Sequence, residues 1–118
     1  MRKMWGGGMR QIGLLAAAAD YAVENHYPLL KKDHERAKRF ADAIAKNDTF
    51  KIDQASVYTN IVLFDVVNGS AEDTLAIFAE NGIGMVPFGP KTIRATFHFQ
   101  VGDNDLEEVI DIVESTEF

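Results

Sequence analysis

The sequence contains no cysteine in its 118 residues, which excludes disulfides, thiolate zinc sites and cysteine nucleophiles. No apolar run reaches the ~18–20 residues that a membrane span needs. The N-terminus, Met1-Arg2-Lys3 and then Met4-Trp5, leads into three glycines and not into the apolar segment of a signal peptide. Basic residues are few, with 12 Lys and Arg against 18 Asp and Glu and a net charge of -6. That charge argues against a nucleic-acid surface. These absences predict a cytoplasmic protein with neither nucleic acid nor membrane as partner.

The length and composition are those of one globular domain, with 47% hydrophobic and 25% charged residues. We therefore expect a single domain over residues 1–118. Residues 1–8 form a basic, glycine-rich N-terminal segment of this domain.

Apolar residues at helical spacing predict four helices. The first begins near Met9, ends near Asn25-His26 and is apolar or small almost throughout, so it needs neighbours on more than one side. The second, residues 29–46, is amphipathic. Ser70 caps the third, which ends at Asn81-Gly82. The last begins near residue 103 and has an acidic outer face, because seven acids and no base follow Gly102.

Strands are expected between these helices. Residues 50–53 and 83–87 suggest short strands. Residues 59–67 form a near-continuous apolar run, which predicts a strand buried on both faces. Residues 92–101 alternate, with one apolar face. The fold class that follows is α+β in two layers: a small antiparallel sheet of about three strands with helices on one face, preceded by the Ala-rich helix.

The residues that suggest chemistry are few. The three histidines have no metal-ligand spacing. Backbone N–H groups of Gly6, Gly7 and Gly8 at a helix start would suit an anion, with Lys3 and Arg10 on either side. The alternative for this block is a floppy tail or an expression remnant.

Arg94 lies on the polar face of the last predicted strand. A guanidinium that projects from a sheet can bind a carboxylate through two parallel hydrogen bonds. The alternative is a surface arginine in a salt bridge. His98 is on the same face but about 13 Å further along, too far to hold one small group together with Arg94.

The N-terminal block closely resembles a signature of the low-specificity threonine aldolases, which are pyridoxal-phosphate lyases of the aspartate-aminotransferase fold type. The resemblance rests on Arg2-Lys3-Met4-Trp5-Gly6-Gly7-Gly8-Met9-Arg10-Gln11 followed by Gly13-Leu14-Leu15-Ala16-Ala17-Ala18. Weaker similarities follow in order at His34-Glu35-Arg36-Ala37, Thr59-Asn60-Ile61-Val62, and Arg94 with His98 and Val101. Together they cover essentially the whole chain.

The resemblance implies a fold, a cofactor and roles. The chain would be the C-terminal small domain of a fold type I enzyme that cleaves β-hydroxy-α-amino acids to glycine and an aldehyde. Arg94 would bind the substrate carboxylate, and Lys3, Gly6, Gly7, Gly8 and Arg10 would lie near the cofactor phosphate, in a neighbouring subunit. The family's Schiff-base lysine lies upstream of the glycine block, so we expect no pyridoxal phosphate and no lyase activity in this chain alone.

Two further hypotheses stay open beside that one. The first of them is a stand-alone, non-catalytic binding or oligomerisation protein that kept the small-domain fold. It would then pair with itself, whereas a fragment would pair with a missing large domain. The last hypothesis is a small acidic domain whose likeness to the aldolases is chance.

Overall fold

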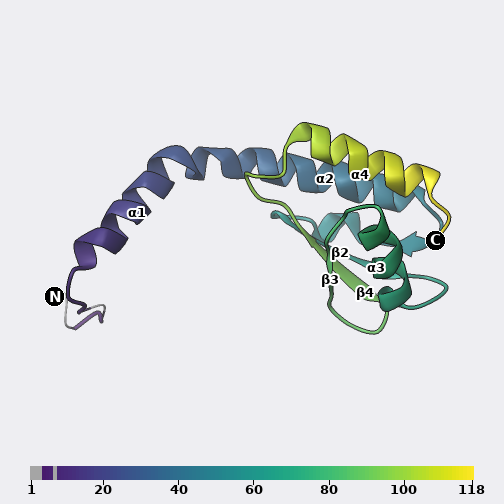
Figure 1. Cartoon of the computed structure of the whole chain (residues 1–118), viewed down its shortest axis with the longest axis horizontal. Coiled ribbons are helices and arrows are strands. Elements are labelled where there is room, and N and C mark those ends of the chain that lie inside the picture. Colours follow the sequence, from purple (N-terminus) through teal and green to yellow (C-terminus); the bar gives the residue numbers. More distant parts are fainter. Residues whose placement is uncertain (1–3, 7) are drawn as a thin grey trace.

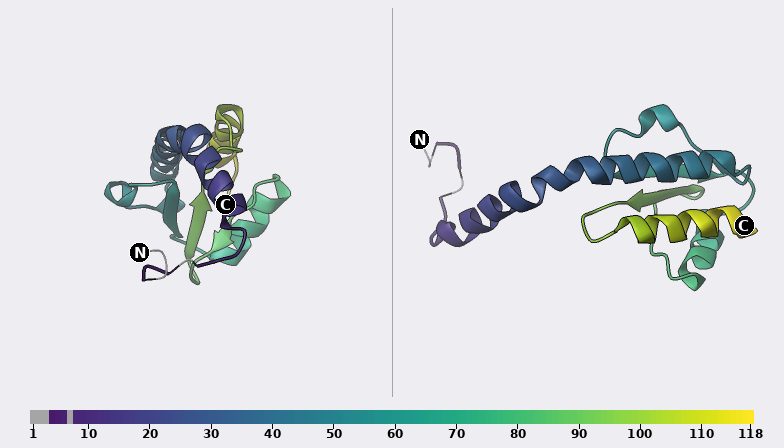
Figure 2. Two further views of the ribbon diagram at one scale, coloured as in Figure 1. Left: turned by 90° about the vertical axis from the view of Figure 1, so that its left-hand side faces the viewer. Right: turned by 90° about the horizontal axis from the view of Figure 1, so that it is seen from above.

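The structure, a computed structural model, describes residues 4–6 and 8–118 (Figure 1). In chain order its elements are α1 (Ile12–Asn25), η1 (Tyr27–Leu29), α2 (Leu30–Lys46), β1 (Phe50–Lys51), η2 (Gln54–Ser56), β2 (Ile61–Val66), α3 (Ala71–Glu80), β3 (Val86–Pro87), β4 (Thr92–Thr96) and α4 (Asp103–Ser115). Helix α1 projects away from a body made of all later elements (Figures 1 and 2). The longest dimension of the molecule, 55 Å against 29 and 28 Å, follows from this projection.

The four predicted helices are confirmed, and local chemistry sets their ends. The hydroxyl of Ser70 accepts a hydrogen bond from the amide of Asp73 at 3.1 Å and caps α3. After α3 the chain turns through Gly82, whose φ of +79° is unfavourable for any residue with a side chain. In α4 the carboxylate of Asp105 accepts from the amide of Gly102 at 2.7 Å.

The α+β class is confirmed, but the sheet has four antiparallel strands in the order β1-β2-β4-β3, not about three. The two short strands expected over residues 50–53 and 83–87 both join it, each contributing two residues to an edge. The central pair β2 and β4 is joined over five residues, from Ile61 opposite Thr96 to Asp65 opposite Thr92.

The expected strand over residues 92–101 is too long, because β4 ends at Thr96. Its neighbour β2 begins only at Ile61, and Asn60 closes the ladder by bonding both backbone groups of Phe97. Beyond that point no strand remains to pair with, and the amide of Val101 bonds the carbonyl of His98 in a turn. Phe99, expected on the buried face, is therefore 51% exposed.

Helices α2, α3 and α4 cover one face of the sheet, and the core lies between them and it (Figure 1). Phenylalanines form its centre. Phe40 of α2 meets Phe64 of β2 at a ring distance of 5.9 Å, and Phe50 of β1 meets Phe78 of α3 at 6.3 Å. Near the C-terminus Phe118 packs against Phe50 at 5.0 Å.

No helix of the described residues covers the opposite face of the sheet, so the expected burial of residues 59–67 on both faces is wrong. Residues of β2 alternate strictly between exposed and buried. Ile61 and Leu63, on the uncovered side, are 42% and 39% exposed. We call this uncovered side, with Lys51, Ile61, Leu63, Asp65, Val86, Thr92, Arg94 and Thr96, the open face.

Among the described residues, helix α1 lacks the packing neighbours that its apolar composition requires. No residue of α1 is buried against the described part of the chain. Leu14 and Val23 are 80% and 64% exposed. The junction with the body is held by His26, which stacks on Phe99 at a ring distance of 4.5 Å.

Candidate functional site

Arg94 lies in the middle of the open face. It is exposed, and the strand register places it directly between Leu63 of β2 and Val86 of β3. Buried Ile93 and Ala95, on either side of it in the chain, fix the face on which its side chain stands. The guanidinium therefore stands on a central strand with an aliphatic residue on each neighbouring strand.

Polar groups occupy the next row of the open face. Lys51, Asp65 and Thr92 are aligned across β1, β2 and β4. The hydroxyl of Thr92 donates to the carboxylate of Asp65. On the open face, Arg94 therefore lies in a mainly aliphatic row. In the next row, the carboxylate of Asp65 already has a hydrogen-bond partner.

The salt-bridge alternative for Arg94 has no support in the described part of the chain. Ion pairs there involve Arg36 and Arg39, which reach from α2 to Asp103 and Glu107 of α4, and Arg36 also pairs with Asp33. Arg94 belongs to none of these pairs. Its five N–H donors remain available to a carboxylate from outside.

The α2–α4 ion pairs serve the body of the fold and not the open face. The Nε of Arg36 donates to Asp103 at 2.8 Å, a hydrogen bond that lowers the pKa of the Asp103 carboxyl and raises the pKa of Arg36. Both residues sit where α4 begins beside α2. They link two helices on the covered side of the sheet.

Only part of the predicted cofactor segment can be placed, since Lys3 and Gly7 lie outside the described residues. Gly6 has a φ of +84°, a conformation that glycine adopts without strain. Gly6, Gly8 and Arg10 are all exposed. A side chain built at Gly6 or Gly8 would meet nothing within 4 Å, so these glycines do not face another described part of the chain closely.

The start of α1 is suited to bind an anion, because no described side chain caps its backbone N–H groups. Gln11 at its N-cap makes no side-chain cap hydrogen bond, and the first turn holds no acid. Free N–H groups and the positive end of the helix dipole favour a negative group there. Arg10, next to these groups, adds a positive charge.

The structure does not bring Arg94 close to Gly6, Gly8 and Arg10, the described part of the predicted phosphate-binding segment. Arg94 lies in the body, whereas Arg10 and Gly8 precede α1, whose 14 residues extend about 21 Å (Figure 2). Hence Arg94 and Arg10 of one copy of the chain cannot both contact the same small ligand. The described residues therefore provide two separate anion contacts, one suited to the phosphate of pyridoxal phosphate and one suited to a carboxylate.

A residue that would hold this cofactor covalently is not found among the described lysines. Every one of them is exposed: Lys31, Lys32, Lys38, Lys46, Lys51 and Lys91. An amine that forms a Schiff base at neutral pH needs a lowered pKa, which burial or a neighbouring cation provides. These exposed positions do not provide the burial.

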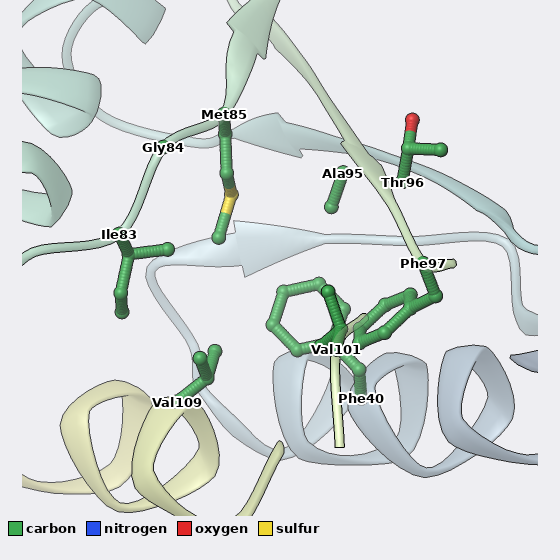
Figure 3. A pocket seen from close by; sticks show the side chains of 9 residues that line it. All are labelled: Phe40, Ile83, Gly84, Met85, Ala95, Thr96, Phe97, Val101 and Val109. Carbon is green, nitrogen blue, oxygen red and sulfur yellow. The ribbon is translucent and has the colours of Figure 1, made fainter. Parts of the chain in front are cut away.

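Two features of the sheet were not predicted from the sequence. One is the aliphatic pair Leu63 and Val86 beside Arg94, hidden because the run 59–67 suggested burial on both sides. The other is a cavity on the covered face, beside Ala95 (Figure 3). Ala95, a small residue in the alternating stretch 92–101, is the sequence feature that indicates such a cavity.

Within the described ranges, no helix is both long and apolar enough to cross a membrane.

Comparison with known proteins agrees with the resemblance. A sequence model of the beta-eliminating lyase family matches residues 1–68. The chain is 37% identical over 109 residues to low-specificity L-threonine aldolase 1 of Arabidopsis thaliana, covering 90% of this chain and 30% of that protein. It is 33% identical over 117 residues to the probable low-specificity L-threonine aldolase 2 of the same plant, covering 97% and 33%.

A shorter but closer similarity is to the low specificity L-threonine aldolase of Escherichia coli K12. The two are 51% identical over 43 residues, which is 36% of this chain and 13% of that protein. The chain spans about a third of the length of the two plant relatives. Its resemblance to the low-specificity threonine aldolases is thereby confirmed, and the chain belongs to the beta-eliminating lyase family.

Proposed function

We propose that this chain is the small domain of a threonine-aldolase-like lyase that cleaves β-hydroxy-α-amino acids to glycine and an aldehyde. Its membership of the beta-eliminating lyase family and its aldolase relatives support the reaction type. The observation that carries the proposal is Arg94, which stands on the open face with no carboxylate partner among the described residues.

Arg94 binds the carboxylate of the amino-acid substrate in this proposal. Its planar guanidinium matches a carboxylate through two parallel hydrogen bonds and fixes the orientation of the substrate. Leu63 and Val86 flank it, so a domain placed over the open face would exclude water from the pair. Exclusion of water strengthens such an ion pair, since the local dielectric constant falls.

The N-terminal segment binds the cofactor phosphate. When bound, pyridoxal phosphate supplies an electron sink for the carbon–carbon cleavage. Lys3, Gly6, Gly7, Gly8 and Arg10 provide backbone N–H groups and positive charge for the phosphate. Because α1 separates them from Arg94, we infer that they serve the site of a neighbouring subunit, in a homo-oligomer.

The isolated chain is inactive and binds no cofactor covalently in this proposal. The exposure of every described lysine supports this. We also infer a cytoplasmic location and no nucleic-acid partner, for which the absence of cysteine and the net charge of -6 are the support.

A chimera tests the proposal. The chain replaces the matching segment of Arabidopsis low-specificity L-threonine aldolase 1, and aldehyde release from threonine and allo-threonine is measured with pyridoxal phosphate present. We expect turnover by the chimera and none by the chain alone. Arg94→Gln in the chimera should raise KM for the amino acid at least tenfold, because the carboxylate loses its charged partner.

The matched control is Lys51→Gln, which removes a positive charge from another strand of the same face. It should leave KM within about twofold. Turnover by the isolated chain would contradict its assignment as a partial enzyme. An Arg94→Gln chimera with unchanged KM would contradict the role of Arg94.

The second candidate is a stand-alone binding or oligomerisation protein without catalysis, and the exposed helix α1 favours it. An apolar helix without neighbours tends to bury its surface against a partner. Sedimentation equilibrium of the chain should then show self-association that Leu14→Lys weakens, since Leu14 is 80% exposed. A monomer at high concentration would exclude this candidate without bearing on the chimera.

A further inference from the structure

A cavity of about 170 Å³ opens on the covered face of the sheet, at the β3 side of β4 (Figure 3). Its floor is made by Phe40 of α2 with Ala95 and Phe97, each at most 5% exposed. Its rim is made by half-buried apolar side chains, namely those of Ile83, Met85, Val101 and Val109. The cavity is thus an apolar hollow with a buried floor and an accessible mouth.

The cavity exists because the sheet opens at this point. Pairing between β3 and β4 reaches from Pro87 opposite Ile93 to Val86 opposite Arg94 and then stops. The next bonded pair in that register would join Gly84 to Thr96, and no such hydrogen bond is present between these two described residues. Ala95, the small residue between Ile93 and Phe97, leaves the space below unfilled.

The lining has no charged side chain. Thr96 contributes the one side-chain hydroxyl, and Figure 3 shows it directed away from the rings of Phe40 and Phe97. The backbone of Gly84, lacking its ladder partner, is the polar group at the mouth. Met85 reaches into the hollow, and its unbranched side chain can adjust to different shapes (Figure 3).

We propose that this cavity binds a small uncharged molecule with an aromatic or branched aliphatic body and at most one hydrogen-bonding group. An apolar cavity of about 150 Å³ in another protein holds benzene, so about six to eight non-hydrogen atoms fit here. A charged ligand is excluded, since nothing in the lining would replace its hydration. This site is on the side of the sheet opposite Arg94 and does not depend on the proposed lyase function.

The test is a titration of the full chain, labelled at methyl groups, with toluene, p-cresol and benzoate, followed by NMR. We expect saturable shifts with toluene and p-cresol at the methyl groups of Met85, Val101 and Val109, and none there with benzoate. Transfer of magnetisation from the toluene ring to the Met85 methyl group would place the ligand inside the cavity.

Two variants fill the cavity from opposite walls. Ala95→Leu fills it from β4, and Val109→Phe fills it from α4. Each should weaken toluene binding at least tenfold, and the second keeps the test valid if the first fails to fold. Ala76→Leu, on an exposed position of α3, adds the same bulk elsewhere and should bind toluene as the parent chain does.

Three results would overturn the proposal. One is the absence of saturable shifts up to the solubility limit of toluene. Another is a response confined to the exposed apolar residues of α1, which would mean nonspecific adsorption. The third is benzoate binding as tightly as toluene, which would contradict the uncharged class of ligand.

Discussion

Helices α1 and α2 follow one another in the chain, joined only by η1, yet α2 is packed against the body and α1 is not. Helix α2 carries many charges and buries Ala37, Phe40, Ala41 and Ile44. Helix α1 is far more apolar, yet none of its residues is buried against the described part of the chain. The difference shows that a helix packs on a single body because its apolar residues share one side, not because it contains many of them.

The two helices also differ in their ends. The first turn of α2 holds Asp33 and its last turn holds Lys46, both favourable to the helix dipole. Helix α1 has no acid at its start and no base at its end. At 14 residues and without packing, it is of a length that is marginal for an isolated helix in water.

The largest difference between the two helices is expected when one large apolar side chain in each is truncated to alanine. Phe40→Ala should lower the free energy of unfolding of the body by about 3–5 kcal/mol, because Phe40 is fully buried. Leu14→Ala, at an 80% exposed position, should change it by less than about 0.5 kcal/mol. Urea denaturation followed by circular dichroism measures both. Equal losses would mean that α1 is packed on the body.

Amide hydrogen exchange should show a smaller and more local contrast. In dilute solution the amides of residues 16–24 should exchange almost as fast as unstructured ones, because α1 opens without exposing any core. Those of residues 40–44 should exchange only through global unfolding. Protection of α1 that rises with protein concentration would show that another copy covers it. Protection at every concentration would contradict the comparison.

The smallest expected effect concerns the ion pair that joins α2 to α4. Because Arg36 lowers the pKa of Asp103, this pair stabilises the fold above the ordinary carboxyl pKa of about 3.9. That stabilisation is lost as the pH falls through the lowered pKa. Asp103→Asn should therefore lower the urea midpoint slightly at pH 7, and the difference from the parent chain should shrink as the pH falls below the ordinary carboxyl range. Glu108→Asn, on the same helix and in none of the ion pairs of the described chain, is the control.

The helices could be predicted from the sequence because their signals are local. Helical spacing, the Ser70 cap and Gly82 each act within a few residues, and all are confirmed. Strand lengths could not be predicted in the same way. A strand ends where its neighbour ends, so β4 stops at Thr96 for a reason that lies in Asn60, the residue just before β2.

For the candidate site, the sequence predicts which residues are suited to bind anions but not their separation. The chemistry of Arg94 and Arg10 is a property of each side chain alone. Arg10 precedes α1 and Arg94 lies on β4, so their separation depends on how that helix leaves the body and on which side of the sheet stays uncovered. The alternation of β2 was concealed because Ile61 and Leu63, on its exposed side, are as apolar as Val62 and Phe64.

The edges of the sheet limit how another chain can pair with it. The outermost strands, β1 and β3, are two residues long, and β3 includes Pro87, which lacks an amide hydrogen. Such edges give another chain almost no ladder to extend, which protects the protein from growth into fibrils. A partner that covers the sheet therefore meets the side chains of its open face and not the backbone of its edges.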